Sequence, residues 1–342
     1  MAEQGLQPGR IRIARELRGF TQADLARRLD ITASAFSQFE AGATRPGPAT
    51  LQKLAEALQV PPAFFAEPVV ESHEGFFRSL RRTAVIDRRR ARAIAQLAHD
   101  LATSRPAADI LPPISLPTFP VMAFDESLDT EQIAEDTRRA LHLGPGPVPH
   151  LVDLLEARGL AIIRMPLNTP DVDAFSVPFP DRPVVVLGAD KNDRARSRFD
   201  LAHELGHLVM HGNEVWGMPE VERQAHSFAA ALLMPRDQIS REFPDHMDWP
   251  RFFALKRRWQ VSLGALLLRA KSIGRLSEAS YLTAVKAASA RGWRRAEPIP
   301  LGEPEQPRWL TRALSKRETA EVFSWLPESI IEDLAQAAIP SR

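Results

Sequence analysis

The stretch RSRFDLAHELGHLVMH, residues 196–211, decides both the expected fold and the expected chemistry of this chain. It contains His203 and His207, four positions apart, with Glu204 directly after the first. On a helix, such residues lie about 40° apart around the axis and about 6 Å apart along it, so both imidazoles can reach one ion. The carboxylate of Glu204 would face the open side of that ion, where it can take a proton from water. The spacing therefore predicts a metal-binding helix that carries its own base.

The residues around this motif favour a helix packed into the protein. Asp193 and Ser197 are suitable helix caps. An apolar surface surrounds the histidines and comprises Phe199, Leu201, Ala202, Leu205, Leu208 and Val209. Two histidines and a glutamate on such a helix need a reason, because burying polar groups without partners is costly. The alternative to a metal site is a pair of hydrogen-bonded core histidines beside a surface glutamate.

A third ligand must come from outside the motif. His211 continues the spacing, but on an unbroken helix it lies about 6 Å beyond His207 and about 12 Å beyond His203. Bonds of about 2 Å cannot span those distances. A chain reversal that would bring a third histidine closer needs a glycine before it, whereas Gly212 follows His211. We therefore expect His211 beside the ligands or at the end of the helix.

Glu222 is the better candidate for the third ligand. It lies near the start of VERQAHSFAAALLMP, residues 221–235, a second apolar helical stretch. Two such helices packed against each other would bring this carboxylate to the two imidazoles. His226 lies one turn further on the same face, at the seam between the helices and within reach of the ligands or the substrate.

Residues 151–298 resemble the ImmA/IrrE family of metallopeptidases. The matching stretches are DAFSV (173–177), RFDLAHELGHLVMH (198–211), ERQAHSFAAALLMP (222–235), RRWQVSLGALLLRA (257–270) and RGWRRAEP (291–298). The resemblance implies that His203, His207 and Glu222 bind the metal and that Glu204 is the general base. The family usually has Asn where this chain has His226. A His₂Glu set suits Zn²⁺ first, and Mn²⁺ or Fe²⁺ also fit such ligands.

The N-terminal part of the chain predicts four short amphipathic helices separated by turns. Thr21 and Thr32 are expected to cap the second and third helices, and Gly42 and Pro46 to end the third. TQADLA (21–26), ITASAFSQFEAG (31–42) and LAEAL (54–58) resemble the helix-turn-helix of phage-repressor-type (Xre) regulators.

This second resemblance implies double-stranded operator DNA as a partner. Gln22, Thr44 and Arg45 would then contact phosphates, while residues of the third helix face the base edges in the major groove, namely Ala33, Ser34, Ser37 and Gln38. Gln38 is the best base reader, because its amide can pair with an adenine edge. Residues 10–53 hold eight Lys/Arg and four Asp/Glu, a net charge of +4 that suits a nucleic-acid face. The alternative is a small helical bundle whose basic face is only solvated.

Composition is that of a globular chain with more than one domain. The chain has 342 residues, of which 44% are hydrophobic and 25% charged, and it contains no cysteine. Without thiolates, a metal must be bound by His and carboxylate groups. No stretch is apolar over the length of a membrane span, and the N-terminus lacks a signal-type apolar core, so we expect a cytoplasmic protein. The chain also shows no internal repeat.

Four segments are expected along the chain. They are the helix-turn-helix domain (1–70), a basic helix with a Pro-rich linker (71–120), the peptidase domain (121–298) and a C-terminal helical tail (299–342). Residues 78–92 hold seven arginines and one aspartate, which indicates a solvated face or a phosphate contact. Residues 105–120 are expected to be extended, and the tail to serve in capping or in a homodimer. The predicted fold is mainly α with a small β-sheet (α+β), an all-α bundle joined to a zincin-like domain.

Two functions compete at this point. In the first, the chain is a DNA-binding regulator with a zinc-dependent endopeptidase. Its substrate would be a protein, typically a helix-turn-helix repressor or antitoxin, cleaved to control stress, mobile-element or defence genes. In the second, it is a non-catalytic transcription factor whose peptidase-like domain senses a metal or small ligand. Glu204 favours the first, since sensing needs ligands but no base.

Overall fold

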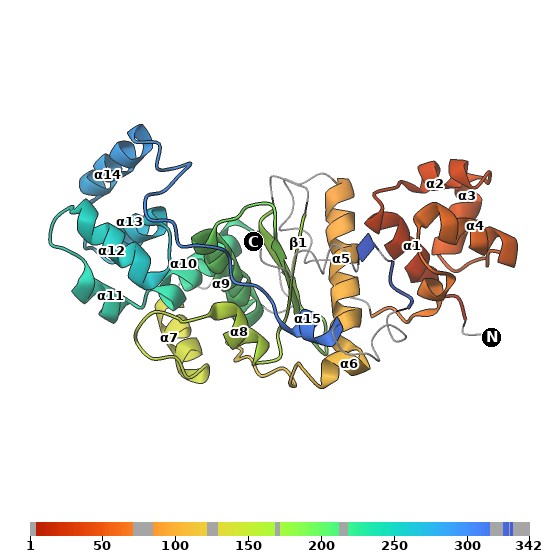
Figure 1. The fold of residues 1–342 in the computed structure, drawn as a ribbon, viewed down its shortest axis with the longest axis horizontal. Helices are drawn as coiled ribbons and strands as arrows, with labels where there is room; N and C mark the ends of the chain where they lie inside the picture. The colour runs from red at the N-terminus through yellow and green to blue at the C-terminus, as the bar shows by residue number, and fades with distance from the viewer. Residues whose placement is uncertain are drawn as a thin grey trace.

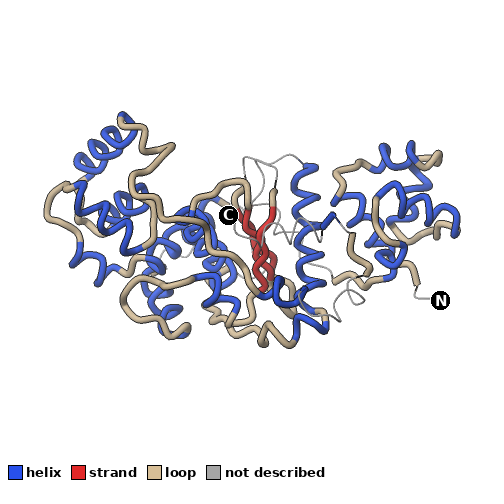
Figure 2. Tube along the Cα trace, in the orientation of Figure 1, coloured by secondary structure: helices blue, strands red, loops and turns tan. Residues whose placement is uncertain are grey.

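The computed structural model describes residues 5–70, 85–121, 129–167, 172–211, 218–314, 324–327 and 329–330. The described part of the molecule is elongated, with a helical bundle at one end, a small sheet in the middle and a helical lobe at the other end (Figure 1). Figure 2 shows the strands enclosed by helices on both sides. This is the predicted α+β architecture. None of the described helices combines the length and apolarity that crossing a bilayer requires.

The N-terminal bundle consists of α1 (Pro8–Leu17), α2 (Gln22–Arg28), α3 (Ala33–Glu40), α4 (Pro48–Leu58) and the 3₁₀ turn η1 (Pro62–Ala66). Thr21 caps α2 in a reciprocal capping box with Asp24, and Thr32 caps α3 by accepting the amide of Ala35. Apolar residues at helical spacing form its core, including Ile11, Leu25, Phe36, Leu54 and Leu58. The four helices and both threonine caps lie where the sequence predicted them.

The turn between α2 and α3 occurs a second time in the chain, between α12 (Trp249–Trp259) and α13 (Leu263–Ser272). Asp30 and Gln260 both have a left-handed backbone, with φ of 56° each. Two positions later, Thr32 and Ser262 each cap the following helix. The likeness is confined to the backbone of this turn and to the capping of the helix that follows it.

The sheet has the order β1-β3-β2, with β1 (Ala161–Met165) parallel to β3 (Val184–Gly188) and β2 (Ala174–Val177) antiparallel to it. Both faces of β3 are buried, which explains its continuous apolar run. Because side chains alternate along a strand, Phe175 and Val177 face one side of the sheet and Ser176 the other. β2 is an edge strand among the strands that the structure describes.

Helix α5 (Val85–Thr103) connects the N-terminal bundle to the sheet. It packs against α1 on one side and against β1 and β3 on the other. Two ion pairs, each with one buried partner, fix the contact with α1: Arg92 holds both carboxylate oxygens of Glu16, and Arg10 Nη1 lies 2.6 Å from Asp100 Oδ2. The arginine run suggested a solvated helix, yet a second face of Ala, Ile and Leu is buried. One hydrophobic core therefore runs from the bundle through α5 to the sheet, across the boundary expected at residue 70.

The stretch 105–120 is not a free linker. It begins with the short helix α6 (Arg105–Ala108), where the sequence predicted an extended chain, and residues 112–120 form neither helix nor strand. This part is bound at both ends, because Ser115 N donates to Arg158 O and Phe119 N donates to Val209 O, each at 2.8 Å. Val209 lies in the last turn of α9, where carbonyls lack partners within the helix. This stretch therefore anchors the end of the motif helix.

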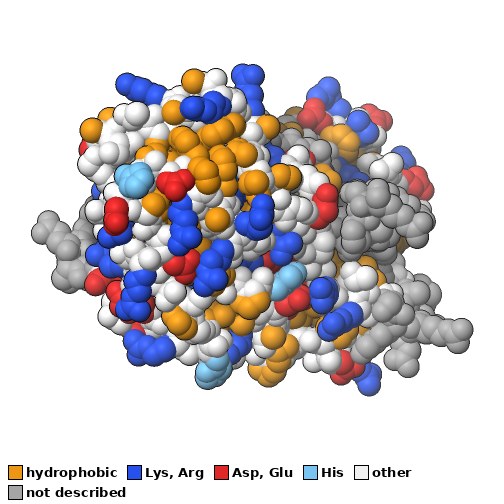
Figure 3. Space-filling model, turned by 60° about the vertical axis from the view of Figure 1, so that its left-hand side comes forward, with side chains coloured by type: hydrophobic (Ala, Val, Ile, Leu, Met, Phe, Trp, Pro, Cys, Tyr) orange, Lys and Arg blue, Asp and Glu red, His pale blue; other side chains and the backbone are white. Residues whose placement is uncertain are grey.

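The helical lobe is built around α9 (Arg194–Met210) and α10 (Pro219–Leu233). Gly206 lies where the two helices meet, and a Cβ atom there would come within 2.8 Å of the Phe228 ring. Glycine at this position therefore permits the close approach of α10 to α9. The surrounding helices are α7 (Thr130–Ala140), α8 (Leu151–Glu156), α11 (Arg236–Glu242), α12, α13 and α14 (Glu278–Ala290). Figure 3 views the molecule with this side turned forward, where apolar side chains gather among charged ones.

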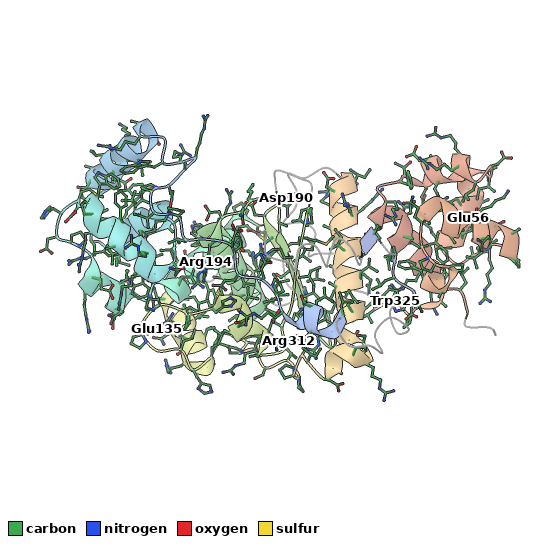
Figure 4. The ribbon with its side chains drawn as sticks, in the orientation of Figure 1. Glu56, Glu135, Asp190, Arg194, Arg312 and Trp325 are labelled. Carbon is green, nitrogen blue, oxygen red and sulfur yellow. The ribbon has the colours of Figure 1, made fainter. Side chains whose placement is uncertain are left out.

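The C-terminal segment contacts both halves of the molecule. Glu305 is buried against Arg198 of α9, and Trp309, in α15 (Trp309–Leu314), donates a 2.7 Å hydrogen bond to Ile162 O of β1. Further along, the Trp325 ring lies 6.1 Å from that of Phe64 in the bundle (Figure 4). Of the predicted helical tail (299–342), the structure describes residues 299–314, which include α15, and residues 324–327 and 329–330; the rest lies outside the described residues.

Candidate metal centre and nucleic-acid interface

Three side chains from α9 and α10 converge at one point: His203, His207 and Glu222. Nε2 of His203 lies 3.1 Å from Nε2 of His207 and 3.2 Å from Oε2 of Glu222, while Nε2 of His207 lies 3.7 Å from Oε1 of Glu222. In a tetrahedral site with bonds of about 2.0–2.2 Å, neighbouring donor atoms are about 3.3–3.6 Å apart. The three donors thus already have nearly the separations that one divalent ion requires.

The bonding within the cluster also fits a cation. Oε1 of Glu222 is buried and accepts no hydrogen bond from the residues that the structure describes. A buried acceptor without a partner is costly, and an ion between it and the imidazoles would satisfy it. Two imidazoles and one carboxylate are the ligand types expected for zinc and related divalent metals. The residues present therefore fit a metal ion.

The charges in the metal-free site follow from burial and from Glu222. Burial works to lower the pKa of His203, but the hydrogen bond that His203 donates to Glu222 and the charges of Glu204 and Glu222 outweigh it, so this pKa is raised. Burial lowers the pKa of His207 to about 4. The pKa of Glu222 lies well below its usual range, because the hydrogen bond from His203 and the nearby imidazole of His207 outweigh burial. The metal-free site therefore combines an ionised Glu222, a neutral His207 and a His203 that binds a proton more readily than a free histidine does.

Glu204 lies beside this cluster and is buried, with 8% of its surface exposed. Oγ of Ser176, on the α9-facing side of β2, donates a 2.6 Å hydrogen bond to Oε2 of Glu204. Burial raises the pKa of Glu204, while the charge of His203 and the bond from Ser176 work in the opposite direction. A carboxylate in this setting holds a proton more readily than a carboxylate in water. A general base needs this property, because it must keep the proton that it accepts until it returns it.

The two other histidines lie on opposite sides of the centre. His211 is the C-cap of α9, and its Nδ1 lies 3.1 Å from Nδ1 of His207. It therefore contacts His207 at the end of α9 without joining the cluster. His226 is exposed, with its ring 4.8 Å from that of Phe199 and 6.4 Å from that of His203. His226 is thus a solvent-exposed neighbour of His203.

Two residues that hydrogen-bond to neighbours of the cluster were not predicted as site residues: Ser176 bonds to Glu204 and Gln224 to His211. The sequence placed Ser176 only in the matching stretch DAFSV (173–177), and Gln224 only in the apolar helical stretch 221–235. The signal for Ser176 was a polar residue inside an otherwise apolar strand, on the face opposite Phe175 and Val177. Gln224 accepts a 2.9 Å hydrogen bond from Nε2 of His211. Helical spacing puts Gln224 and Glu222 on different faces of α10, so no sequence signal placed both beside α9.

The residues expected to read DNA share one exposed surface of the bundle. On α3 these are Ala33, Ser34, Ser37 and Gln38, and after it Thr44 and Arg45. Phe36, on the opposite side of the same helix, is fully buried. The helix therefore presents its predicted face to solvent, available for a major groove.

Gln22, the expected phosphate contact at the start of α2, is already bonded within the bundle. Its Nε2 donates a 2.6 Å hydrogen bond to Oε2 of Glu40, whose carboxylate also accepts a hydrogen bond of 2.7 Å from Arg15. A phosphate contact would have to use the remaining donor capacity of the amide. Glu40 thus ties the ends of α1, α2 and α3 together.

Comparison with known families finds two matching models. One, described as a helix-turn-helix, matches residues 11–65. The other, described as an IrrE N-terminal-like domain, matches residues 155–271, which include the His203, His207 and Glu222 cluster. No match was found among curated proteins. The two matches confirm the fusion expected from the sequence.

Proposed function

Because this chain fuses an Xre-like helix-turn-helix domain to an IrrE-like metallopeptidase domain, we propose that it is a DNA-binding regulator that cleaves a protein partner. The observation that supports the proposal best is the convergence of His203, His207 and Glu222 beside a buried, ionisable Glu204. A site that only sensed a metal would need the three ligands but no base.

We propose that His203, His207 and Glu222 hold a divalent ion, with zinc as the first choice. When bound, such an ion lowers the pKa of water and polarises the carbonyl to be attacked. Glu204 accepts the proton of the attacking water and returns it to the departing amine. Ser176 holds the Glu204 carboxylate in one orientation through the 2.6 Å hydrogen bond. Manganese or iron(II) would suit the same ligands.

The substrate is proposed to lie along β2. This strand is at the edge of the sheet as described, and its Ser176 contacts the base directly. An extended peptide paired with such an edge would pass beside Glu204. His226, exposed next to His203, is then placed to contact the peptide at the reacting carbonyl. An extended segment of a folded or partly folded protein is the substrate class that this arrangement suits.

The partner that best fits both domains is a repressor or antitoxin bound near the same operator. The exposed face of α3, with Gln38 as the base reader, would bind the operator. Cleavage of the partner would then release stress, mobile-element or defence genes. The competing proposal is a transcription factor that senses a metal or small ligand. One argument favours it: DNA binding alone is sufficient for gene regulation.

One comparison separates the two proposals. The purified chain is mixed with Zn²⁺ or Mn²⁺ and with the repressor encoded beside its gene, and wild type is compared with Glu204→Gln. We expect a specific cleavage product with the wild type, none with the variant, and equal operator binding by both. Intact repressor in both reactions, together with equal gene regulation by both proteins in cells, would support the sensor instead.

A further inference from the structure

His207 is joined, through the ring nitrogen that faces away from the cluster, to two side chains that the proposed chemistry does not use. Its Nδ1 lies 3.1 Å from Nδ1 of His211, and Nε2 of His211 lies 2.9 Å from Oε1 of Gln224. All three side chains are buried, with 2%, 4% and 5% of their surfaces exposed. They connect the C-cap of α9 to the second turn of α10, on the far side of His207 from Glu222.

The direction of these hydrogen bonds follows from the one group that can only accept. Oε1 of Gln224 has no proton, so His211 must donate to it from Nε2. The neutral ring of His211 then has a lone pair on Nδ1, which accepts the proton on Nδ1 of His207. With its proton on Nδ1, His207 keeps a lone pair on Nε2. That atom faces Nε2 of His203 at 3.1 Å and Oε1 of Glu222 at 3.7 Å.

The opposite orientation of the Gln224 amide would reverse every bond. The amide nitrogen would donate to His211, which would donate from Nδ1 to His207, and His207 would carry its proton on Nε2. A proton on that atom points at the position of the ion and blocks coordination. The amide orientation thus decides whether His207 can act as a ligand.

We propose that Gln224 and His211 are positioning residues that hold His207 in the Nδ1-protonated tautomer, so that its Nε2 lone pair faces the metal position before an ion arrives. The inference rests on the proposed metal site and deepens it. Partners of this kind fix the tautomer and the orientation of a metal-binding imidazole, and their loss typically lowers metal affinity about 10–100-fold. The usual partner of a metal-binding imidazole is a carbonyl or a carboxylate. Here the carbonyl of Gln224 fixes the tautomer of His211, and His211 in turn fixes that of His207.

Zinc affinity, measured by competition with a chromophoric chelator, tests the proposed role of Gln224 and His211 without any substrate. Gln224→Met keeps the length of the side chain but removes the acceptor, whereas Gln224→Glu keeps an acceptor. Arg223→Ala, at the exposed neighbouring position on α10, is the matched control. We expect affinity to fall about 10–100-fold in Gln224→Met, to stay within a few-fold of wild type in Gln224→Glu, and to be unchanged in Arg223→Ala.

A second measurement needs no metal. Nitrogen-15 spectra of the imidazoles in the metal-free wild type report which ring nitrogen of His207 carries the proton. We expect Nδ1, and a shift toward Nε2 in Gln224→Met. The proposed role of Gln224 and His211 is overturned if wild-type His207 is protonated on Nε2, or if wild type and Gln224→Met bind zinc with equal affinity. Failure of the wild type to bind zinc at all would instead count against the proposed metal site.

Discussion

Oγ of Ser176 donates a 2.6 Å hydrogen bond to Oε2 of Glu204, and this bond joins the edge strand β2 to the middle of α9. It links the strand along which a peptide is proposed to lie to the base that would act on it. The two residues are 28 positions apart in the chain and meet only because β2 presents Ser176 toward α9. The position of the base is therefore set by the sheet as well as by its own helix.

Ser176→Ala should reduce kcat on the order of tenfold while leaving zinc affinity unchanged, since Glu204 is not a proposed ligand. The bond from Ser176 lowers the pKa of Glu204 against the effect of burial. Without the bond this pKa rises, so the acid limb of the kcat profile should move to higher pH. Kinetics across pH 5–8 check both effects, with Ser289→Ala, an exposed serine on α14, as the control. An identical pH profile in wild type and Ser176→Ala would rule out this role.

Zinc binding should strengthen with pH because His203 must lose a proton before it can bind an ion. Its pKa is raised above 6.5, whereas that of His207 is lowered to about 4 and that of Glu222 lies lower still. Only His203 therefore competes with the ion between pH 5 and its own pKa. We expect about one proton, that of His203, to be released per zinc ion at pH 5.5–6. Calorimetry in buffers of different ionisation enthalpy measures this number, and a value near two or zero at pH 5.5 contradicts the assignment.

Glu305→Ala should destabilise the protein through α9. The guanidinium of Arg198 is buried, pairs with Glu305 and donates a 2.7 Å hydrogen bond to Val148 O. Removing one partner of a buried pair leaves the other charge uncompensated, at a cost of about 3–5 kcal/mol. Urea unfolding measures the change, with Glu303→Ala at an exposed position two residues earlier as the control. A loss below about 1 kcal/mol would show that the C-terminal segment does not hold the motif helix.

Gln38→Ala should weaken specific operator binding by about 1–3 kcal/mol, because the amide is proposed to pair with a base edge. Binding to unrelated DNA depends on phosphate contacts and should change little. Fluorescence anisotropy with operator and scrambled duplexes separates the two effects. Gln132→Ala, exposed on α7 in the other half of the molecule, is the control. If binding to both duplexes weakened equally, Gln38 would contact the DNA backbone and not a base.

The sequence allowed prediction of those features that depend on local spacing. The four-residue interval of His203 and His207 predicted their common face on α9, and the apolar repeat around Glu222 predicted the helix that carries it. Ser176 and Gln224 could not be assigned in this way. Their roles depend on the register of β2 against β3 and on how closely α10 approaches α9 at Gly206. Such tertiary relationships leave no periodic trace in the chain.

The same limit explains α5. Its arginines at 88–90 dominate the composition and suggested a solvated helix or a phosphate contact. The small residues that follow, such as Ala91 and Ala93, are buried in the core that joins the bundle to the sheet. Alanine is only a weak indicator of burial. The sequence therefore did not predict that this helix packs between the bundle and the sheet, despite its many arginines.

Calorimetric titration of zinc into the metal-free chain tests the metal centre most directly. We expect one ion per chain for the wild type and for Glu204→Gln, and binding weakened at least a hundredfold for Glu222→Ala. Equal binding by the wild type and Glu222→Ala, or no binding by the wild type, would contradict a metal site formed by His203, His207 and Glu222.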